Sequence, residues 1–284
     1  MPPNLKGALL GLAGMGLFAC ADVTIKALGA GYDPFQILFF AGLMSVPLLA
    51  GMAMADPAAA SLRPCRPGLM ALRCCIVVLN GICGTYAFST LPLAQCYAIF
   101  FTMPIFITLL SAVILGEKID TPRGLAVVAG LIGVVVALDP GTSALQWGHA
   151  VALAGAVFGA ANYVMIRISG GVERTVVMIL YPVMLQLVVA AVALPLVYVP
   201  MPLVDLGLAA LMAGLAFAGY LAIIAAYRHA PGIVVAPMQY SQILWAAILG
   251  ALLFDEVMSL RTVAGVVIIV AAGVVIVTRP DRTG

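Results

Sequence analysis

The sequence predicts an all-α integral membrane protein with ten transmembrane helices, arranged as two inverted five-helix repeats. The first observation behind this prediction is composition, since 64% of the 284 residues are hydrophobic and 8% are charged, against about 25% charged in soluble domains. The second is the length of the apolar stretches, and the third is an internal repeat. The apolar stretches lack the two-residue alternation of a transmembrane barrel, so helices are expected.

Ten apolar stretches have roughly the length, about 20 residues, that crosses a bilayer as a helix. The loops between them are too short to fold as a separate domain. In chain order the expected spans are 7–28, 34–54, 68–89, 94–115, 123–139, 148–168, 175–196, 203–227, 233–254 and 260–278.

The second half of the chain repeats the first. The matched positions are Leu12–Gly14 with Leu153–Gly155, Ile25 and Lys26 with Ile166 and Arg167, Pro92 with Pro231, Glu117 with Glu256, and Gly133 and Pro140 with Gly273 and Pro280. Five spans per half is an odd number, so the second repeat enters the bilayer in the opposite sense. We therefore expect repeats over 1–141 and 142–284, the design in which secondary transporters hold a substrate site near the bilayer midplane.

Basic residues fall almost entirely on one side of the expected spans. Of the 13 Lys and Arg residues, all but Lys26 and Arg261 lie on the side of the N-terminus. The positive-inside rule makes that side cytoplasmic, and an even number of spans returns the C-terminus to it. We expect a bacterial inner-membrane protein with both termini in the cytoplasm. The net charge of +2 gives no basic stripe suited to nucleic acid.

A cleaved signal sequence is the alternative interpretation of the first span, because Leu17–Ala21 resembles a cleavage box after an apolar run. The repeat matches residues on both sides of that box, so we expect the span to be retained. All six cysteines lie in the first half, without the spacing of metal ligands. We expect neither a metal nor another cofactor.

Short motifs in the first half resemble the EamA domain of the drug/metabolite transporter superfamily. They are Tyr86–Ala94, Thr102–Ile105, Leu115–Lys118 and Asp139–Gly141, with weaker copies at Tyr227–Gly232, Phe254–Glu256 and Arg279–Pro280. The resemblance implies ten helices, cytoplasmic termini and a central cavity lined largely by spans 1, 3, 4, 6, 8 and 9. Among family members, the chain is most similar to the bacterial ten-helix exporters of aromatic and other amino acids. Ile243 departs from the pattern, since it stands at the repeat position of Pro104.

Charged residues inside or at the ends of spans are candidates for gating or coupling, because an unpaired charge in hydrocarbon is costly. Asp22 and Lys26 lie one turn apart on one face of the first span, so we expect a local ion pair. It serves either an outer gate or proton step, or charge compensation alone. Glu117 and Glu256 end their spans and are interpreted as helix ends or as partners of a nearby basic residue.

Polar and aromatic residues at bilayer depth are candidates for substrate binding, with helix packing as the alternative role. The fourth and ninth spans hold the densest such content, and residues at i+3 or i+4 spacing share a face. A pocket of amides and aromatic faces, without a carboxylate cluster, suits a neutral or zwitterionic solute. The expected lining residues are Asn80, Tyr97, Phe101, Asn162, Tyr163, Gln239, Gln242 and Trp245.

These features predict a secondary transporter that moves a small metabolite by alternating access, with amino-acid export preferred on the resemblance. Uptake of a solute resembling S-adenosylmethionine or a vitamin is the first alternative. An integral-membrane enzyme is the alternative of another class, disfavoured because His149 and His229 lie near opposite faces and form no catalytic constellation. Proton coupling and facilitated diffusion both stay open. Expected partners are a small-molecule substrate and the lipid bilayer; the oligomeric state is left open, a monomer included.

Overall fold

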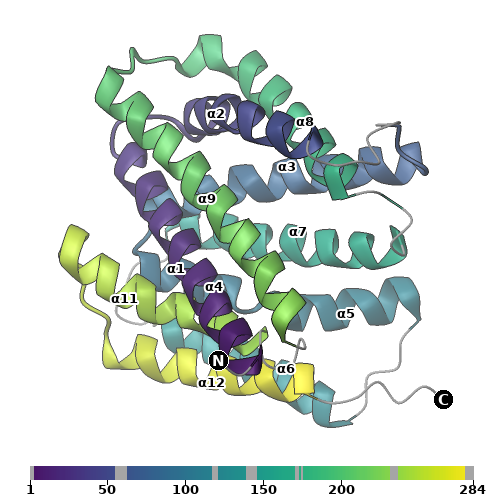
Figure 1. The fold of residues 1–284 in the computed structure, drawn as a ribbon. Helices are drawn as coiled ribbons and strands as arrows, with labels where there is room; N and C mark the ends of the chain where they lie inside the picture. The colour runs from purple at the N-terminus through teal and green to yellow at the C-terminus, as the bar shows by residue number, and fades with distance from the viewer. Residues whose placement is uncertain are drawn as a thin grey trace.

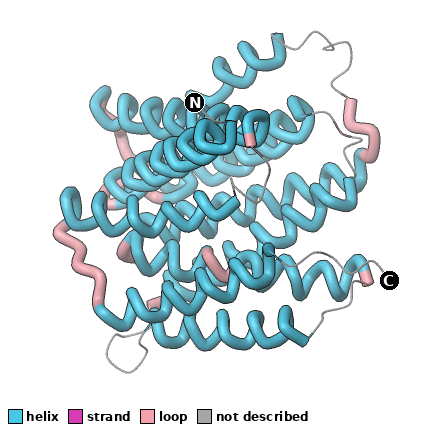
Figure 2. Tube along the Cα trace, turned by 60° about the horizontal axis from the view of Figure 1, so that its bottom comes forward, coloured by secondary structure: helices cyan, strands magenta, loops and turns pink. Residues whose placement is uncertain are grey.

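The computed structural model describes residues 3–54, 63–116, 121–138, 146–169, 173, 175–230 and 236–278. Within these ranges the chain is helical and contains no strand, as Figure 2 shows. Glu117 and the repeat boundary expected at 141/142 lie outside the described residues. The elements in chain order are α1 (Pro3–Gly29), α2 (Pro34–Met54), α3 (Pro67–Thr90), α4 (Leu93–Phe100), α5 (Met103–Leu115), α6 (Thr121–Leu138), α7 (Trp147–Ser169), α8 (Thr175–Val197), α9 (Leu203–His229), the 3₁₀-helix η1 (Ala236–Tyr240), α11 (Ser241–Phe254) and α12 (Leu260–Thr278).

Seven helical stretches in the described ranges are long and apolar enough to cross a membrane, with α4 and α5 counted as one. The other three expected spans are also helical, as α6, η1 with α11, and α12. The apolar stretches found within them are shorter, at Gly124–Ala137, Met238–Phe254 and Leu260–Ala272. The chain is a multi-pass helical membrane protein, but length alone does not give the expected count of ten spans.

Proline positions explain where several helices begin. The helices α2 and α3 start at Pro34 and Pro67, while Pro92 and Pro202 stand immediately before α4 and α9. The first turn of a helix has backbone N–H groups without partners, so a residue that lacks an N–H and has a fixed φ costs nothing there. These boundaries could therefore be read from the sequence.

Several helices of the first half pack against helices of the second half. In Figure 1 the purple helix α1 lies along the green helix α9, and α3 packs against α7. Likewise, α2 packs against α8 and α6 against α12. Gly14 and Gly219 let α1 and α9 approach closely, because a Cβ on either would lie 3.2 or 3.1 Å from the other's carbonyl oxygen. Small residues at crossings are the usual device for packing helices in lipid.

Polar groups at the α1–α2 corner are satisfied by the second half of the chain. The buried Gln36 amide exchanges two hydrogen bonds with the backbone of Val199, of 2.6 and 2.9 Å. The Tyr32 hydroxyl donates to Asp205 at 2.6 Å, and this hydrogen bond raises the pKa of the Tyr32 phenol. These contacts join the start of α2 to the α8–α9 connection.

The crossing of α6 and α12 should be sensitive to an added methyl group. A Cβ at Gly265 would lie 2.4 Å from the backbone nitrogen of Ala137 and 2.5 Å from the carbonyl oxygen of Gly133. We expect Gly265→Ala to lower stability by about 1–3 kcal/mol, because the clash is with backbone that cannot rotate away. Thermal unfolding in detergent measures the effect. The control is Gly214→Ala on α9, where a Cβ meets nothing within 4 Å; equal melting temperatures for the two variants would contradict the packing argument.

Candidate functional site

The fourth helical stretch is broken into α4 and α5 at Phe101 and Thr102. Pro104 has no N–H to donate, and its ring excludes the carbonyl four residues earlier. The backbone tightens here, with Thr102 N bonded to Ile99 O at 3.0 Å and Ile105 N to Thr102 O at 2.9 Å. The Thr102 hydroxyl also donates to the Ile99 carbonyl at 2.6 Å. The break therefore changes the direction of the side chains around it.

The ninth stretch changes from a 3₁₀-helix to an α-helix at the position that corresponds to the break in the fourth. The residue at the repeat position of Pro104 is not a proline. The 3₁₀-helix η1 passes into α11 at Ser241, whose hydroxyl donates to the Met238 carbonyl at 2.6 Å. Thr102 and Ser241 are separated by the same interval as Pro92 and Pro231. Both halves thus interrupt one helix with a hydroxyl that satisfies a carbonyl three residues back, and at membrane depth such backbone is tolerated where it is buried in protein or borders a cavity.

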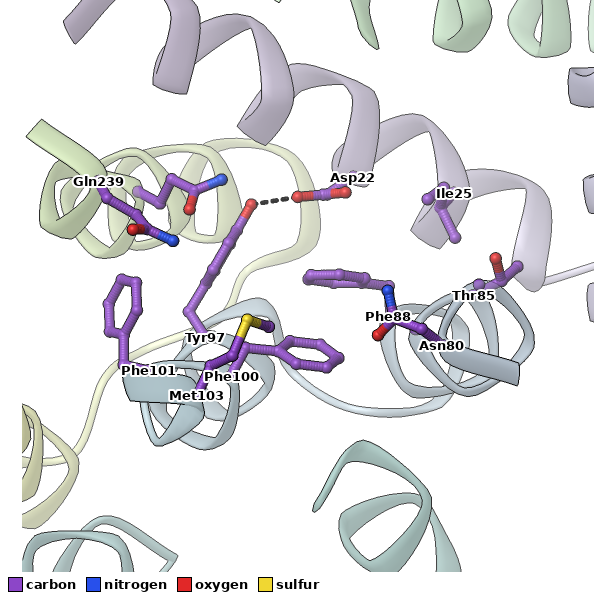
Figure 3. Close-up of a pocket in the computed structure, with 13 residues that line it drawn as sticks. Asp22, Ile25, Asn80, Thr85, Phe88, Tyr97, Phe100, Phe101, Met103 and Gln239 are labelled. Carbon is purple, nitrogen blue, oxygen red and sulfur yellow. Dashed lines mark hydrogen bonds between the residues drawn. The ribbon is translucent and has the colours of Figure 1, made fainter. Parts of the chain in front are cut away.

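A cavity of about 310 Å³ lies between these interrupted helices, α1 and α3 (Figure 3). Its volume falls at the lower end of the range for small-molecule sites, roughly 300–1,000 Å³. The lining residues are Asp22, Ile25, Asn80, Gly81, Gly84, Thr85, Phe88, Tyr97, Phe100, Phe101, Met103, Gln239 and Gln242.

Aromatic rings form a connected wall of the cavity. The ring of Tyr97 lies 5.4 Å from that of Phe88 and 6.1 Å from that of Phe101, centroid to centroid. Phe100 stacks on Phe88 at 5.5 Å, and Phe101 meets Tyr240 of the second half edge-on at 5.4 Å. Each such pair contributes about 0.5–1.5 kcal/mol beyond the burial of the rings, so the wall is stabilised by contacts among its own members.

Asp22 brings a carboxylate to this wall from α1. The Tyr97 hydroxyl donates a hydrogen bond to Asp22 Oδ2, drawn as the dashed line in Figure 3. Tyr97 is 3% exposed, so the hydrogen bond is shielded from bulk solvent. The pair links α1 to α4 at the cavity.

Lys26, one turn beyond Asp22, does not form the expected ion pair with it. Its ammonium lies 2.6 Å from Glu256 Oε1, donates to the Leu91 carbonyl at 2.7 Å and stands 5.3 Å from the Phe254 ring centroid. Helical spacing places Asp22 and Lys26 on one face, but the Lys26 side chain is long enough to reach the second half of the chain. The expected local partner is therefore replaced by a distant one.

Glu256 is positioned by the turn that follows α11. Asp255 adopts a left-handed conformation with φ of 54°, and the Glu256 N–H closes the helix end by donating to the Gly250 carbonyl at 3.0 Å. Glu256 Oε2 then accepts from the first amide of α4, Leu93 N, at 2.9 Å. A carboxylate at a helix N-terminus is favoured by the helix dipole. His149 at the start of α7 adds a second bridge at this end of α4, 3.1 Å from Gln95 Oε1.

Five of the residues expected from the sequence line the cavity: Asn80, Tyr97, Phe101, Gln239 and Gln242. Asn162, Tyr163 and Trp245 lie outside the lining. Tyr163 is 50% exposed, and Trp245 packs against Gly16 of α1, where an added Cβ would meet its ring at 3.1 Å. The Asn162 Oδ1 atom is buried without a hydrogen-bond partner.

The sequence analysis missed Phe88, Phe100 and Met103 as lining residues. Adjacent residues of a regular helix point about 100° apart, and Phe100 and Phe101, which stand at the break, line the cavity with rings that point in different directions (Figure 3). Pro104 was the available signal for that break, and it does not say how far the side chains rotate. Phe88 lies within a quoted motif, yet its direction depends on how α3 meets α4.

Comparisons with known proteins agree on the kind of protein. Residues 5–138 match the EamA-like transporter family. The pseudopaline exporter CntI of Pseudomonas aeruginosa is 28% identical over 94% of both chains. An S-adenosylmethionine uptake transporter of Rickettsia bellii is 24% identical over 90% of this chain and 88% of its own. A riboflavin transporter of Rhizobium johnstonii is 26% identical over 48% of this chain and 43% of its own.

A solved crystal structure of a protein at 18% identity has a similar fold. It aligns with a TM-score of 0.66 over 95% of both chains. This likeness concerns the fold alone.

Lys26 and Glu256 each form the ion pair and also a hydrogen bond to a backbone group, so the stabilities of their variants should follow both contacts. Lys26→Gln or Glu256→Gln should each cost about 1–3 kcal/mol, because the remaining charge is largely buried, at 15% and 18% side-chain exposure, without its partner. The double Gln variant should recover part of the loss, since an amide can donate to Leu91 and accept from Leu93. The charge swap Lys26→Glu with Glu256→Lys should not recover it, because it sets acceptor against acceptor and donor against donor. Melting temperatures in detergent test this, and full recovery by the swap would show that the ion pair matters without the backbone contacts.

Proposed function

We propose that this chain, whose residues 5–138 match the EamA-like transporter family, is a secondary carrier of the bacterial inner membrane that moves a small metabolite by alternating access. The observation that carries this proposal is a cavity bordered by both halves of the chain, which the ion pair of Lys26 and Glu256 also joins. Among the described residues that line the cavity, Tyr97 and Asp22 are the only acid–base pair in contact, so a carrier explains the cavity better than an enzyme does.

Two inverted five-helix repeats are the architecture that we propose for this carrier. The proposed two-fold relation exchanges corresponding helices of the two halves: α1 with α7, α2 with α8, α3 with α9 and α6 with α12. Under this exchange, the contact of α1 with α9 becomes the contact of α7 with α3. The relation maps the α2–α8 and α6–α12 contacts onto themselves, and all four contacts occur. The matched hydroxyls of Thr102 and Ser241 support the same relation. Inverted repeats allow the two halves to rock about a central site.

The structure corresponds to one state of the proposed cycle. At the Lys26 end, α4 packs against α11, and the bonds of Glu256 join α1, α4 and α11. In the described part of the chain, the other half-helix, α5, packs against α7 and α12, and its packing against η1 is weak at most, unlike the packing of α4 against α11. Taken with the side preference of the basic residues, we propose that the Lys26 end faces the periplasm and that both termini are cytoplasmic.

Amino acids are the cargo that we propose, with export as the direction. A cavity of about 310 Å³ with three amides and an aromatic wall suits a neutral or zwitterionic solute with an apolar side chain. Uptake of a solute like S-adenosylmethionine is the second candidate, favoured by the similarity to an uptake transporter over 90% of the chain.

Flux in proteoliposomes tests the transport function directly. We expect purified protein to move radiolabelled phenylalanine or another neutral amino acid above the rate of empty liposomes. Assays with solute loaded inside or outside, each with and without a pH gradient, separate export from uptake and show whether protons are coupled. Transport of S-adenosylmethionine with no amino-acid flux would support the second candidate, and no flux for any solute of the panel would contradict both.

Two asparagines on neighbouring helices provide a matched test of the cavity. Asn80→Leu should lower flux several-fold while leaving the melting temperature nearly unchanged, because the solute loses a polar partner worth on the order of 1 kcal/mol. Asn162→Leu should keep the flux and keep or raise the melting temperature, because Asn162 Oδ1 is buried without a partner and leucine removes that unpaired group. The opposite pattern, with flux lost in Asn162→Leu and retained in Asn80→Leu, would move the solute site away from this cavity.

A further inference from the structure

A carboxylate that forms no ion pair with a basic side chain of the described residues lines the cavity. Asp22 lies seven residues before the end of α1 at Gly29, about 10 Å inside the helix at 1.5 Å per residue. Its contact is the neutral hydroxyl of Tyr97. The basic residue one turn away, Lys26, is held by Glu256 and by the Leu91 carbonyl. Among the described residues, no basic side chain forms an ion pair with Asp22.

An ionised carboxylate at this depth needs a counter-charge. Moving a charge out of water into a low-dielectric site is expensive, and one neutral hydrogen bond offsets part of that cost. Protein cations are the usual partners of buried carboxylates, but here the available lysine is used elsewhere. Among the described residues that line the cavity, Asp22 alone is charged and no side chain is basic, so a cationic ligand would supply the counter-charge that an ionised Asp22 lacks.

The rings around Asp22 also favour a cation. Figure 3 shows Phe88, Phe100 and Phe101 gathered with Tyr97 on the side of the cavity opposite α1. The face of an aromatic ring is the negative end of its quadrupole, and it attracts an ammonium within about 6 Å of the centroid. A carboxylate and aromatic rings that line one cavity suit an organic ammonium group that has apolar substituents.

We propose that Asp22 is the counter-ion of a protonated amine on the transported solute, so that organic ammonium compounds, amino acids among them, are the substrate class of the cavity. This inference rests on the proposed transport function. The amides of Gln239 and Gln242, which both line the cavity, donate to a carboxylate or hydroxyl elsewhere on the solute. A solute that has the ring and the carboxylate but lacks the amine leaves Asp22 without a partner and is rejected.

Equilibrium binding tests the substrate class without requiring flux. Purified full-length protein in detergent is titrated by calorimetry with phenethylamine, phenylalanine and 3-phenylpropionate, which share the ring and differ in their charged groups. We expect the two amines to bind the wild type at least about tenfold more tightly than 3-phenylpropionate, the ratio that loss of a charge-assisted hydrogen bond produces. Asp22→Asn should weaken both amines by a similar factor, while Asp22→Glu keeps most of the affinity.

Asp205→Asn is the matched control for the loss of a tyrosine–aspartate contact. Asp205 accepts from the Tyr32 hydroxyl at 2.6 Å but does not line the cavity, so this variant should bind amines like the wild type. The variants are compared after thermal unfolding shows that each is folded, and the selectivity of the wild type tests the inference even where a variant is not.

Three results would overturn the inference: no binding of either amine, equal binding of phenethylamine and 3-phenylpropionate, or unchanged amine affinity in folded Asp22→Asn. Liposome flux distinguishes these failures from failure of the transport function. If solutes that lack an amine are transported and amines do not bind, the proposed substrate class is wrong and the transport function stands. Amine binding that depends on Asp22, without flux of any solute, keeps the site and rejects the carrier.

Discussion

The need to pair charges in a low-dielectric environment determines how the two halves of this protein meet. Lys26 on α1 and Glu256 after α11 lie 2.6 Å apart, and they also bind the Leu91 carbonyl and the Leu93 amide. One interaction therefore joins α1, α11 and the start of α4. These helices cannot separate at this end unless water replaces the lost partners of both charges, because hydrocarbon offers no other.

The engagement of Lys26 also shapes the chemistry of the cavity. If Lys26 turned back to Asp22, the cavity would present a neutralised ion pair. With Lys26 held by Glu256, Asp22 keeps the hydroxyl of Tyr97 and a face toward the cavity. The same arrangement thus joins the two halves through Lys26 and leaves the Asp22 carboxylate among the residues that line the cavity, which links the contact between the halves to the proposed substrate class.

The interrupted helices explain why the sequence indicated some aromatic residues of the cavity but not the directions in which their side chains point. Tyr97 and Phe101 were expected to share a face, and both line the cavity. Phe100 was not expected, because adjacent residues of a regular helix point about 100° apart. The two residues stand at the turn at Phe101 and Thr102, whose geometry depends on backbone hydrogen bonds that a helical period does not describe. In the ninth stretch, Ser241 marks a similar change without the proline that marks the first.

The sequence by itself determined the class of this protein, a helical multi-pass membrane protein, and the approximate position of each apolar stretch. Hydropathy, proline positions and helical period are properties of neighbouring residues, so they can be read before the chain is folded. The choice among partners is not local. Lys26 had Asp22 one turn away and bound Glu256 from the far end of the chain instead. Asn80 and Asn162 looked equivalent along their helices, yet Asn80 lines the cavity and Asn162 does not. Only the docking of helices decided these cases, because the energy of a buried charge or amide depends on which groups the fold brings within hydrogen-bond distance.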